Sequence, residues 1–311
     1  MMKNIGKYIL KALLSLFGHL PLKVHYANAR FLAWLIGDCI GYRRDDVVVN
    51  LARSFPEKTY PELIALRKAF YRHFADLIVE AVWFGACTNP ERLRKAHIVE
   101  FKNPEFVNDI FEKSPGIVSL YSHCGNWELL GNLAVYNYTD TPYSFDERNM
   151  VIVHKALSSK LWDGIFAHNR TAPLKYRREI DGYVETGSLV RFMYSHKDER
   201  RIYIITNDQS PYTQSRNNVD LEFMHQPTRA MSATAAIARK FGHAVVYSGM
   251  RRMEPGHYEI TFTTICEDAS MMETEEIIRR FYELLQQDIE AQPESYTWSH
   301  RRWKHKIENH A

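Results

Sequence analysis

Cysteine is scarce in this chain of 311 residues, and the four that occur lie far apart, at Cys39, Cys87, Cys124 and Cys266. The absence of a CxxC pair or a close His/Cys grouping argues against a zinc ribbon or a disulfide scaffold and favours reduced thiols. Long apolar runs are also missing. Gly18, Pro21 and Lys23 interrupt the N-terminal apolar residues, so no run approaches the roughly 20 residues that a spanning helix needs. No good signal-peptide cleavage site follows, and we expect this segment to be retained.

An excess of one charge is absent as well, because 40 Lys and Arg stand against 37 Asp and Glu, for a net charge of +3. So small a net charge does not indicate nucleic-acid binding. The basic residues gather at the two ends: residues 1–44 hold seven Lys or Arg and one Asp, and residues 298–306 hold four and no acid. With 45% hydrophobic residues and no repeat or low-complexity segment, the chain can bury a large core.

Helical periodicity dominates the first hundred residues. Apolar residues recur there at three- and four-residue spacing in Ile5–Phe17, Tyr26–Ile40, Asp45–Ser54 and Pro61–Phe84. We therefore predict a helical N-terminal region over residues 1–100, followed by an α/β domain over residues 101–311.

The first of these helices is predicted to be amphipathic. One face can gather Ile5, Ile9, Leu13, Leu16 and Phe17, while the residues off that face include Lys3, Lys7 and Lys11. This arrangement suits a helix that lies in a membrane interface, and it suits equally a helix that packs on its own domain.

From Pro115 onward, short apolar runs alternate with helical patterns. The predicted strands are Gly116–Tyr121, Met150–Val153, Arg201–Thr206, Ala244–Met250 and His257–Thr264. The predicted helices are Leu157–Ala167, Glu185–Tyr194, Ser232–Phe241 and Thr274–Gln292. Alternation of this kind predicts an α/β fold in which a mixed sheet carries helices on both faces. The last two strands are joined by a short turn, so we expect them to pair antiparallel.

The most informative stretch is His123-Cys124-Gly125-Asn126-Trp127-Glu128, which directly follows a predicted strand. Loops at the carboxyl ends of strands gather the active sites of open α/β sheets. If the Gly125-Asn126 turn folds the chain back, Glu128 can orient the His123 ring, and His123 can then deprotonate a hydroxyl group. The alternative is that His123 bonds a buried carbonyl and Glu128 caps the following helix. A nucleophilic Cys124 would need a base that the spacing does not indicate, and a metal site would need a third ligand.

The string His-Cys-Gly-Asn-Trp-Glu closely resembles the His-x4-Asp/Glu signature of the glycerolipid acyltransferase superfamily, in the form used by the lipid A biosynthesis (late) acyltransferases. The resemblance covers nearly the whole chain. It includes Arg44 through Asn50-Leu51 to Phe55-Pro56, Phe70-Tyr71-Arg72-His73, Asp208-Gln209-Ser210-Pro211, Leu221 through Ala230, Ala235–Lys240 and Pro293 through Lys304.

The resemblance implies an enzyme that moves a fatty acyl group from a thioester, on acyl carrier protein or acyl-CoA, to a hydroxyl of a lipid acceptor. A lipid A precursor is favoured over a lysophospholipid or an aminolipid. His123 would be the general base, Glu128 would orient it, and backbone amides around Gly125 and Asn126 would bind the oxyanion. No metal or other cofactor is implied, and the implied location is the cytoplasmic face of the bacterial inner membrane, either peripheral or with an N-terminal anchor. A lipid or thioester hydrolase and an inactive lipid-binding relative are the rival functions.

Two positions depart from the family pattern. Lys155 stands where the family usually has an Arg, so a point charge replaces a bidentate clamp for the phosphate or carrier that we expect it to contact. Ala230-Met231-Ser232-Ala233 lacks the Gly that commonly precedes its helix.

Two further segments allow more than one interpretation. Asp208 and Gln209 are expected to shape the substrate site, although an Asx turn alone would explain them. The basic, aromatic Trp298–Lys306 segment suits an interfacial anchor, a dock for an acidic acyl carrier, or a solvated tail.

Overall fold

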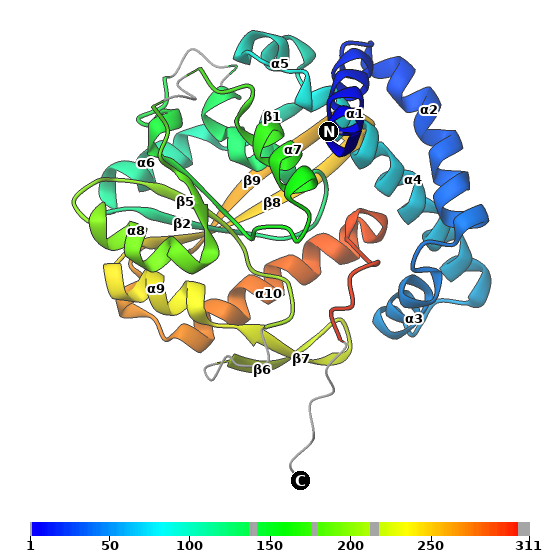
Figure 1. The fold of residues 1–311 in the computed structure, drawn as a ribbon. Helices are drawn as coiled ribbons and strands as arrows, with labels where there is room; N and C mark the ends of the chain where they lie inside the picture. Colours follow the sequence, from blue (N-terminus) through cyan, green and yellow to red (C-terminus); the bar gives the residue numbers. More distant parts are fainter. Residues whose placement is uncertain (1, 137, 139–141, 176–178, 212–217, 304–311) are drawn as a thin grey trace.

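Seven strands form one mixed sheet in the computed structural model, which describes residues 2–136, 138, 142–175, 179–211 and 218–303 (Figure 1). They are β1 (Val99–Phe101), β2 (Ile117–Tyr121), β3 (Met150–His154), β4 (Tyr183–Glu185), β5 (Ile202–Thr206), β8 (Ala244–Glu254) and β9 (His257–Cys266). Their order across the sheet is β1-β9-β8-β2-β5-β3-β4. The pairs run parallel except for β8 and β9, which confirms both the mixed sheet and the antiparallel last pair.

Helices cover both faces of this sheet. Along β2 the buried side chains alternate: Ile117 and Tyr121 belong to one hydrophobic cluster, and Val118 and Leu120 to another. The first cluster includes residues of α5 (Pro90–Ala96) and α6 (Pro104–Lys113), and the second includes residues of α9 (Ala233–Phe241) and α10 (Thr274–Ala291). The remaining helices of this part are α7 (Lys160–Thr171) and α8 (Leu189–Ser195). The predicted α/β fold, a mixed sheet with helices on both faces, is therefore confirmed.

The predicted N-terminal helices are all present. They are α1 (Met2–Gly18), α2 (Leu22–Trp34) with its π-helical continuation η1 (Leu35–Ile40), α3 (Arg44–Ser54) and α4 (Tyr60–Gly85). Before α4, the Thr59 backbone N–H donates to the Glu62 carboxylate at 2.7 Å, which helps to fix where this helix begins. Small residues let α2 lie close along α4, where Ala29 and Ala33 form a buried cluster with Ala75 and Val79. Figure 1 shows these helices together on one side of the molecule.

Helix α1 packs on α4 through the C-terminal end of α1. Much of the apolar face of α1 stays uncovered. Side-chain exposure is 54% at Ile9, 69% at Leu16 and 51% at Phe17. The side chains of Lys3, Ile5, Lys7 and Lys11 lie outside what the structure describes. Among the described residues, none of the helices is both long enough and apolar enough to cross a membrane.

Several short elements were not predicted. The helices α5 and α6 and the strands β1 and β4 are ten residues or fewer in length, too short for a clear periodicity. A separate hairpin of β6 (Asn218–Phe223) and β7 (Gln226–Met231) turns through Met224 and His225, whose φ angles of 52° and 58° are left-handed. Non-glycine residues rarely signal such a turn in a sequence.

Residues 298–303 of the C-terminal segment pack against the protein, so the interpretation of this part as a solvated tail, and of Trp298 as an interfacial anchor, is wrong. Trp298 is 0% exposed and its indole N–H donates to the Pro293 carbonyl at 2.6 Å. The Asn50 side chain of α3 donates to the carbonyls of Trp298 and His300 at 2.8 and 3.0 Å. The Trp303 indole donates to Thr228 at 2.8 Å, and the residues that follow, including Lys304 and Lys306, lie outside the described part of the chain. A tryptophan held in the core in this way has no side-chain surface to offer a membrane.

Candidate active site

The site is assembled at the carboxyl ends of two neighbouring parallel strands. In the register of β2 and β5, Tyr121 lies opposite Thr206. His123 is two residues beyond Tyr121 and Asp208 is two residues beyond Thr206, so the register brings them side by side. The Asn207 N–H also donates to the Tyr121 carbonyl at 3.0 Å, which continues the pairing past the strand ends.

Both ring nitrogens of His123 are hydrogen bonded. Nδ1 lies 2.8 Å from Oδ1 of Asp208, and Nε2 lies 3.1 Å from the side-chain nitrogen of Gln209. An ionised carboxylate can only accept, so Nδ1 carries the ring proton and the Nε2 lone pair accepts from the Gln209 amide. The His123 backbone N–H donates to Oδ2 of the same Asp208 at 3.1 Å. Asp208 thus fixes both the tautomer and the orientation of the ring.

Electrostatics keeps this pair polarised. Burial is the largest single effect and lowers the pKa of His123, but the charge and hydrogen bond of Asp208 and the charge of Glu128 together outweigh it, and the net pKa is raised above its usual value. Burial raises the pKa of Asp208, yet His123 and two hydrogen bonds outweigh it and the net pKa is lowered. Asp208 is only 2% exposed and stays ionised, which favours the protonated form of the ring.

The structure places Glu128 differently from the prediction. Its two carboxylate oxygens accept from Nε and Nη2 of Arg170 on α7, at 2.6 and 2.7 Å. This bidentate pair points the carboxylate at the guanidinium, while the His123 nitrogens are bonded to Asp208 and Gln209. The prediction that Glu128 orients the ring by a hydrogen bond is therefore wrong for this structure. Glu128 still acts on His123 through space, because it raises the pKa of the ring.

The loop between these residues is held by the C-terminal segment. The Gly125 N–H donates to the Ser295 carbonyl at 3.1 Å, and the Thr297 hydroxyl donates to the His123 carbonyl at 3.0 Å. Gly125 has a φ of +60°, and a Cβ there would come within 2.9 Å of the Met250 side chain, so glycine is required. Because its N–H is already bonded, the predicted use of the Gly125 amide to bind an oxyanion does not fit this structure.

Residues 1–305 match the family model described as bacterial lipid A biosynthesis acyltransferase. The chain belongs to this family. Comparison with curated protein sequences finds no match. Membership makes the chain an acyltransferase that uses an acyl donor and a lipid acceptor, in a family that is generally membrane-associated.

The other predicted site residues of this acyltransferase lie around the same sheet edge. Lys155 is exposed and directly follows β3, the neighbour of β5. Asn126 is buried, and its side chain donates to Glu80 on α4 at 2.7 Å, so that group faces away from solvent. A narrow crevice beside the site is lined by Asn126, Glu128 and Asn169 together with the apolar Ala81, Phe84 and Phe166.

The Cys124 thiol is not poised to act as a nucleophile. Burial raises the pKa of the Cys124 thiol well above its usual value, so it remains protonated and poorly nucleophilic. Within the ranges that the structure describes, no three His, Cys, Asp or Glu side chains are grouped as metal ligands would be.

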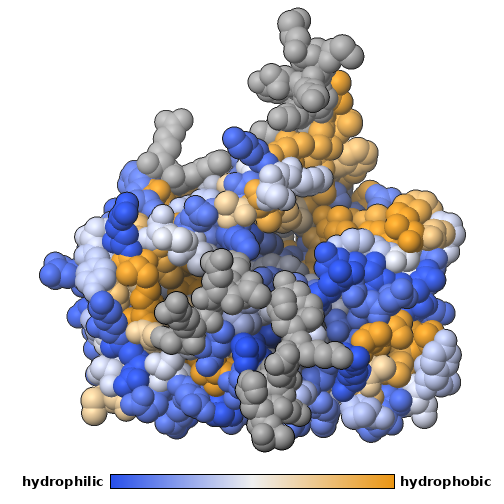
Figure 2. Space-filling model, turned by 60° about the horizontal axis from the view of Figure 1, so that its bottom comes forward, coloured by the Kyte–Doolittle hydropathy of each residue, from blue (hydrophilic) through white to orange (hydrophobic). Residues whose placement is uncertain are grey.

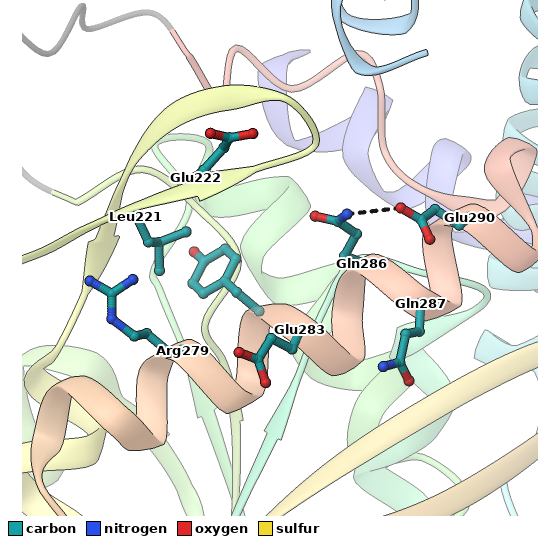
Figure 3. A pocket seen from close by; sticks show the side chains of 8 residues that line it. Leu221, Glu222, Arg279, Glu283, Gln286, Gln287 and Glu290 are labelled. Carbon is teal, nitrogen blue, oxygen red and sulfur yellow. Dashed lines mark hydrogen bonds between the residues drawn. The ribbon is translucent and has the colours of Figure 1, made fainter. Parts of the chain in front are cut away.

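A separate hollow of about 280 Å³ lies between β6 and α10 (Figure 3). Its lining is polar and largely charged, including Glu222, Arg279 and Glu283, and Gln286 donates to Glu290 at 2.8 Å. None of the lining residues belongs to the His123 site.

Sequence reasoning missed two contributors to the site. Arg170 lies on α7 but beyond the end of the predicted helix Leu157–Ala167, and nothing local marks it as the partner of a carboxylate 42 residues earlier. Thr297 sits inside the segment that resembles the family, yet its bond to the His123 carbonyl spans 174 residues. Both contacts depend on tertiary packing, which spacing along the sequence does not reveal.

Proposed function

We propose that the enzyme transfers a fatty acyl group from an acyl thioester, on acyl carrier protein or CoA, to a hydroxyl of a lipid A precursor. The observation that carries this proposal is the His123–Asp208 pair, which leaves the Nε2 lone pair of a partly exposed ring at the sheet edge. Nε2 takes the proton from the acceptor hydroxyl as its oxygen attacks the thioester carbonyl carbon. The tetrahedral intermediate then breaks its C–S bond, and the sulfur leaves as a thiol with the proton that His123 returns.

Gln209 has a defined place in this cycle. Its amide donates to Nε2 when no substrate is bound, at 3.1 Å, so the acceptor hydroxyl must take its place there. Once displaced, the amide is a donor next to the reacting carbonyl and can bind the oxyanion that develops on it. Asp208 stabilises the imidazolium, and the Glu128 carboxylate, held by Arg170, adds to that stabilisation through space.

A transfer assay separates this proposal from its rivals. In separate reactions, the enzyme is incubated with a lipid A precursor, a lysophospholipid or an aminolipid. Each reaction also contains the acyl donor, acyl carrier protein thioester or acyl-CoA, with a radiolabelled acyl group. We expect labelled lipid A precursor. Labelled free fatty acid would indicate a hydrolase, no labelled product an inactive lipid-binding relative, and preference for another lipid would replace the proposed acceptor.

Lys155 is proposed to contact a phosphate of the acceptor. It lies two strands along the sheet edge from His123, about 10 Å at the usual spacing of strands. An ammonium attracts phosphate equally in the ground and transition states, so Lys155→Ala should raise the KM for a phosphorylated acceptor and change kcat little.

The control for this variant is Lys197→Ala, which removes the same charge from the segment leading into the opposite end of β5. Steady-state kinetics with phosphorylated and dephosphorylated acceptors should show an effect of Lys155→Ala on the first acceptor only. If wild type and Lys155→Ala have equal KM values for the phosphorylated acceptor, Lys155 does not contact the phosphate.

The apolar surface of the N-terminal helices is proposed to dock on the cytoplasmic face of the bacterial inner membrane. Figure 2 shows apolar surface gathered on the side where α1 and α2 lie. The exposed residues there are Ile9, Leu13, Leu16 and Phe17 on α1, and Val24, Phe31 and Trp34 on α2. Apolar side chains at this density on two neighbouring helices suit insertion into the headgroup region.

Membrane docking predicts that the protein sediments with phospholipid vesicles and that high salt releases little of it, since salt screens charge but not apolar insertion. Leu16→Glu combined with Phe31→Glu should leave most of the protein in the supernatant, because burying such a side chain contributes about 1.5–3 kcal/mol. Met271→Glu, at a residue 85% exposed elsewhere, is the control and should still sediment. Wild-type protein that stays soluble with vesicles at low salt would refute the docking.

A further inference from the structure

Glu80 of α4 is a fully buried carboxyl group that joins three parts of the fold. Its Oε1 accepts from the Tyr26 hydroxyl of α2 at 2.7 Å. Its Oε2 accepts from the Tyr258 hydroxyl of β9 at 2.8 Å and from the Asn126 side chain at 2.7 Å. Burying a carboxyl group is costly unless its oxygens are bonded, and both oxygens are bonded here. Apolar residues can often fill such a position with less penalty, so stability alone does not account for the carboxyl group.

Only one of the three partners, Asn126, belongs to the loop of the active site. Asn126 lies between His123 and Glu128 and directly precedes the 3-10 helix η2 (Trp127–Val135), which begins beside Glu128. The C-terminal segment holds this loop at His123 and Gly125. Glu80, on α4, fixes the next residue of the loop, Asn126, through its side chain.

The surroundings of Glu80 also indicate what can replace it. Burial raises the pKa of Glu80 above its usual value, against the effect of its three hydrogen bonds. Glutamine has the same length as glutamate and offers one carbonyl acceptor and one amide donor. Glutamine can therefore donate to the Tyr26 oxygen and accept from Asn126 and Tyr258, whereas alanine can do neither.

We propose that Glu80 is a positioning residue for acyl transfer, whose carboxyl group holds the Asn126 side chain and thereby the placement of His123 relative to the Glu128–Arg170 pair. The inference rests on the proposed function of His123 as the base. Being 0% exposed, Glu80 acts through Asn126 and not by touching a substrate.

The test is a double-mutant cycle on kcat. Glu80→Ala and Asn126→Ala should each lower kcat by about 10- to 100-fold with little change in KM, since displacing a catalytic group by about 1 Å can cost that much. Because both changes break the same contact, the double variant should be no slower than the slower single variant. Glu80→Gln should restore kcat to within about threefold of wild type, because it keeps the bond to Asn126.

Tyr26→Phe is the matched control, because it removes another hydrogen bond from the same carboxyl group without touching the loop. It should lower the melting temperature and leave kcat unchanged. The proposal is overturned if folded Asn126→Ala keeps the wild-type kcat, if the two losses add, or if Tyr26→Phe lowers kcat as much as Asn126→Ala. If the melting curve shows that Glu80→Ala is unfolded, the kcat values of the other two variants decide the test. The kcat of Asn126→Ala should fall, and that of Glu80→Gln should stay near the wild-type value.

A substrate-free measurement separates this proposal from the proposed function. NMR titration of the His123 ring should give a pKa above the usual value in wild type and in Tyr26→Phe, and a lower pKa in Asn126→Ala, where the loop is no longer held against Asp208. If wild type transfers no acyl group to any acceptor, the proposed function fails while the titration still tests the positioning. Identical titrations of Asn126→Ala and wild type would overturn the positioning role.

Discussion

Replacing His123 by alanine is expected to lower kcat for acyl transfer by about 1000-fold or more, because a positioned general base contributes about 10²–10⁴-fold. Neither hydrogen-bond partner of the ring can take over. Gln209 has no basic atom, and Asp208 is almost completely buried. The residual rate should rise with hydroxide concentration, since the hydroxyl proton must then go to solvent.

The chain offers a matched control for this variant. His196 has nearly the same side-chain exposure as His123, 19% against 18%, and it too bonds an aspartate, with Nε2 at 3.0 Å from Asp181. His196→Ala should retain the wild-type kcat and lose only a little stability. Melting curves must show both variants folded. A folded His123→Ala enzyme whose kcat lies within a few-fold of wild type would exclude His123 as the base.

The sequence predicts one half of the proposed catalytic pair better than the other. His123 follows a strand whose five residues are all buried, and the glycine at 125 marks a tight turn, so local pattern places this histidine at a sheet edge. Asp208 follows an equally clear strand, but nothing in either segment says that the two strands are neighbours. The order β2-β5-β3 is set by how the helices pack, so a carboxylate 85 residues away could not be identified as the partner. Glu128 lies only five residues from His123, so spacing and the His-x4-Glu signature both favour it as the partner of the ring.

The same contrast between local and distant contacts holds for the rest of the fold. The helices and longer strands follow from periodicity, because a segment of ten or more residues needs one continuous apolar face to pack at all. Trp298 shows where this reasoning fails. Its neighbours Arg301 and Arg302 suggest an exposed segment, yet its own side chain is buried and the Arg302 guanidinium donates to the Arg229 carbonyl at 2.9 Å. Charge composition does not reveal that a guanidinium has carbonyl partners inside the protein.

Asp208→Asn is expected to lower kcat by at least about 100-fold through a change of tautomer, without loss of bulk. Asp208 accepts from two donors of His123, the ring Nδ1 at 2.8 Å and the backbone N–H at 3.1 Å. Asparagine has one oxygen to offer. If that oxygen keeps the backbone N–H, its amide donates to Nδ1, the ring proton moves to Nε2, and the base has no lone pair for the substrate.

The pH dependence of kcat/KM should also change in Asp208→Asn, in a direction that follows from the His123 pKa. The base must be unprotonated, so kcat/KM in wild type should fall as the pH drops through the His123 pKa, which Asp208 and Glu128 raise above 6.5. Removing the Asp208 charge leaves burial to lower that pKa, so the acid limb of the Asp208→Asn profile should move to lower pH as its plateau falls.

Glu128→Gln should move the acid limb in the same direction and by less. It should keep the proton on Nδ1, because Glu128 acts on the ring through space while its oxygens bind Arg170. The ¹⁵N chemical shifts of the His123 ring report the tautomer directly. If Glu128→Gln changes the tautomer while Asp208→Asn preserves it, Glu128 is the residue that orients the base, and the pairing of His123 with Asp208 is not the one used in catalysis.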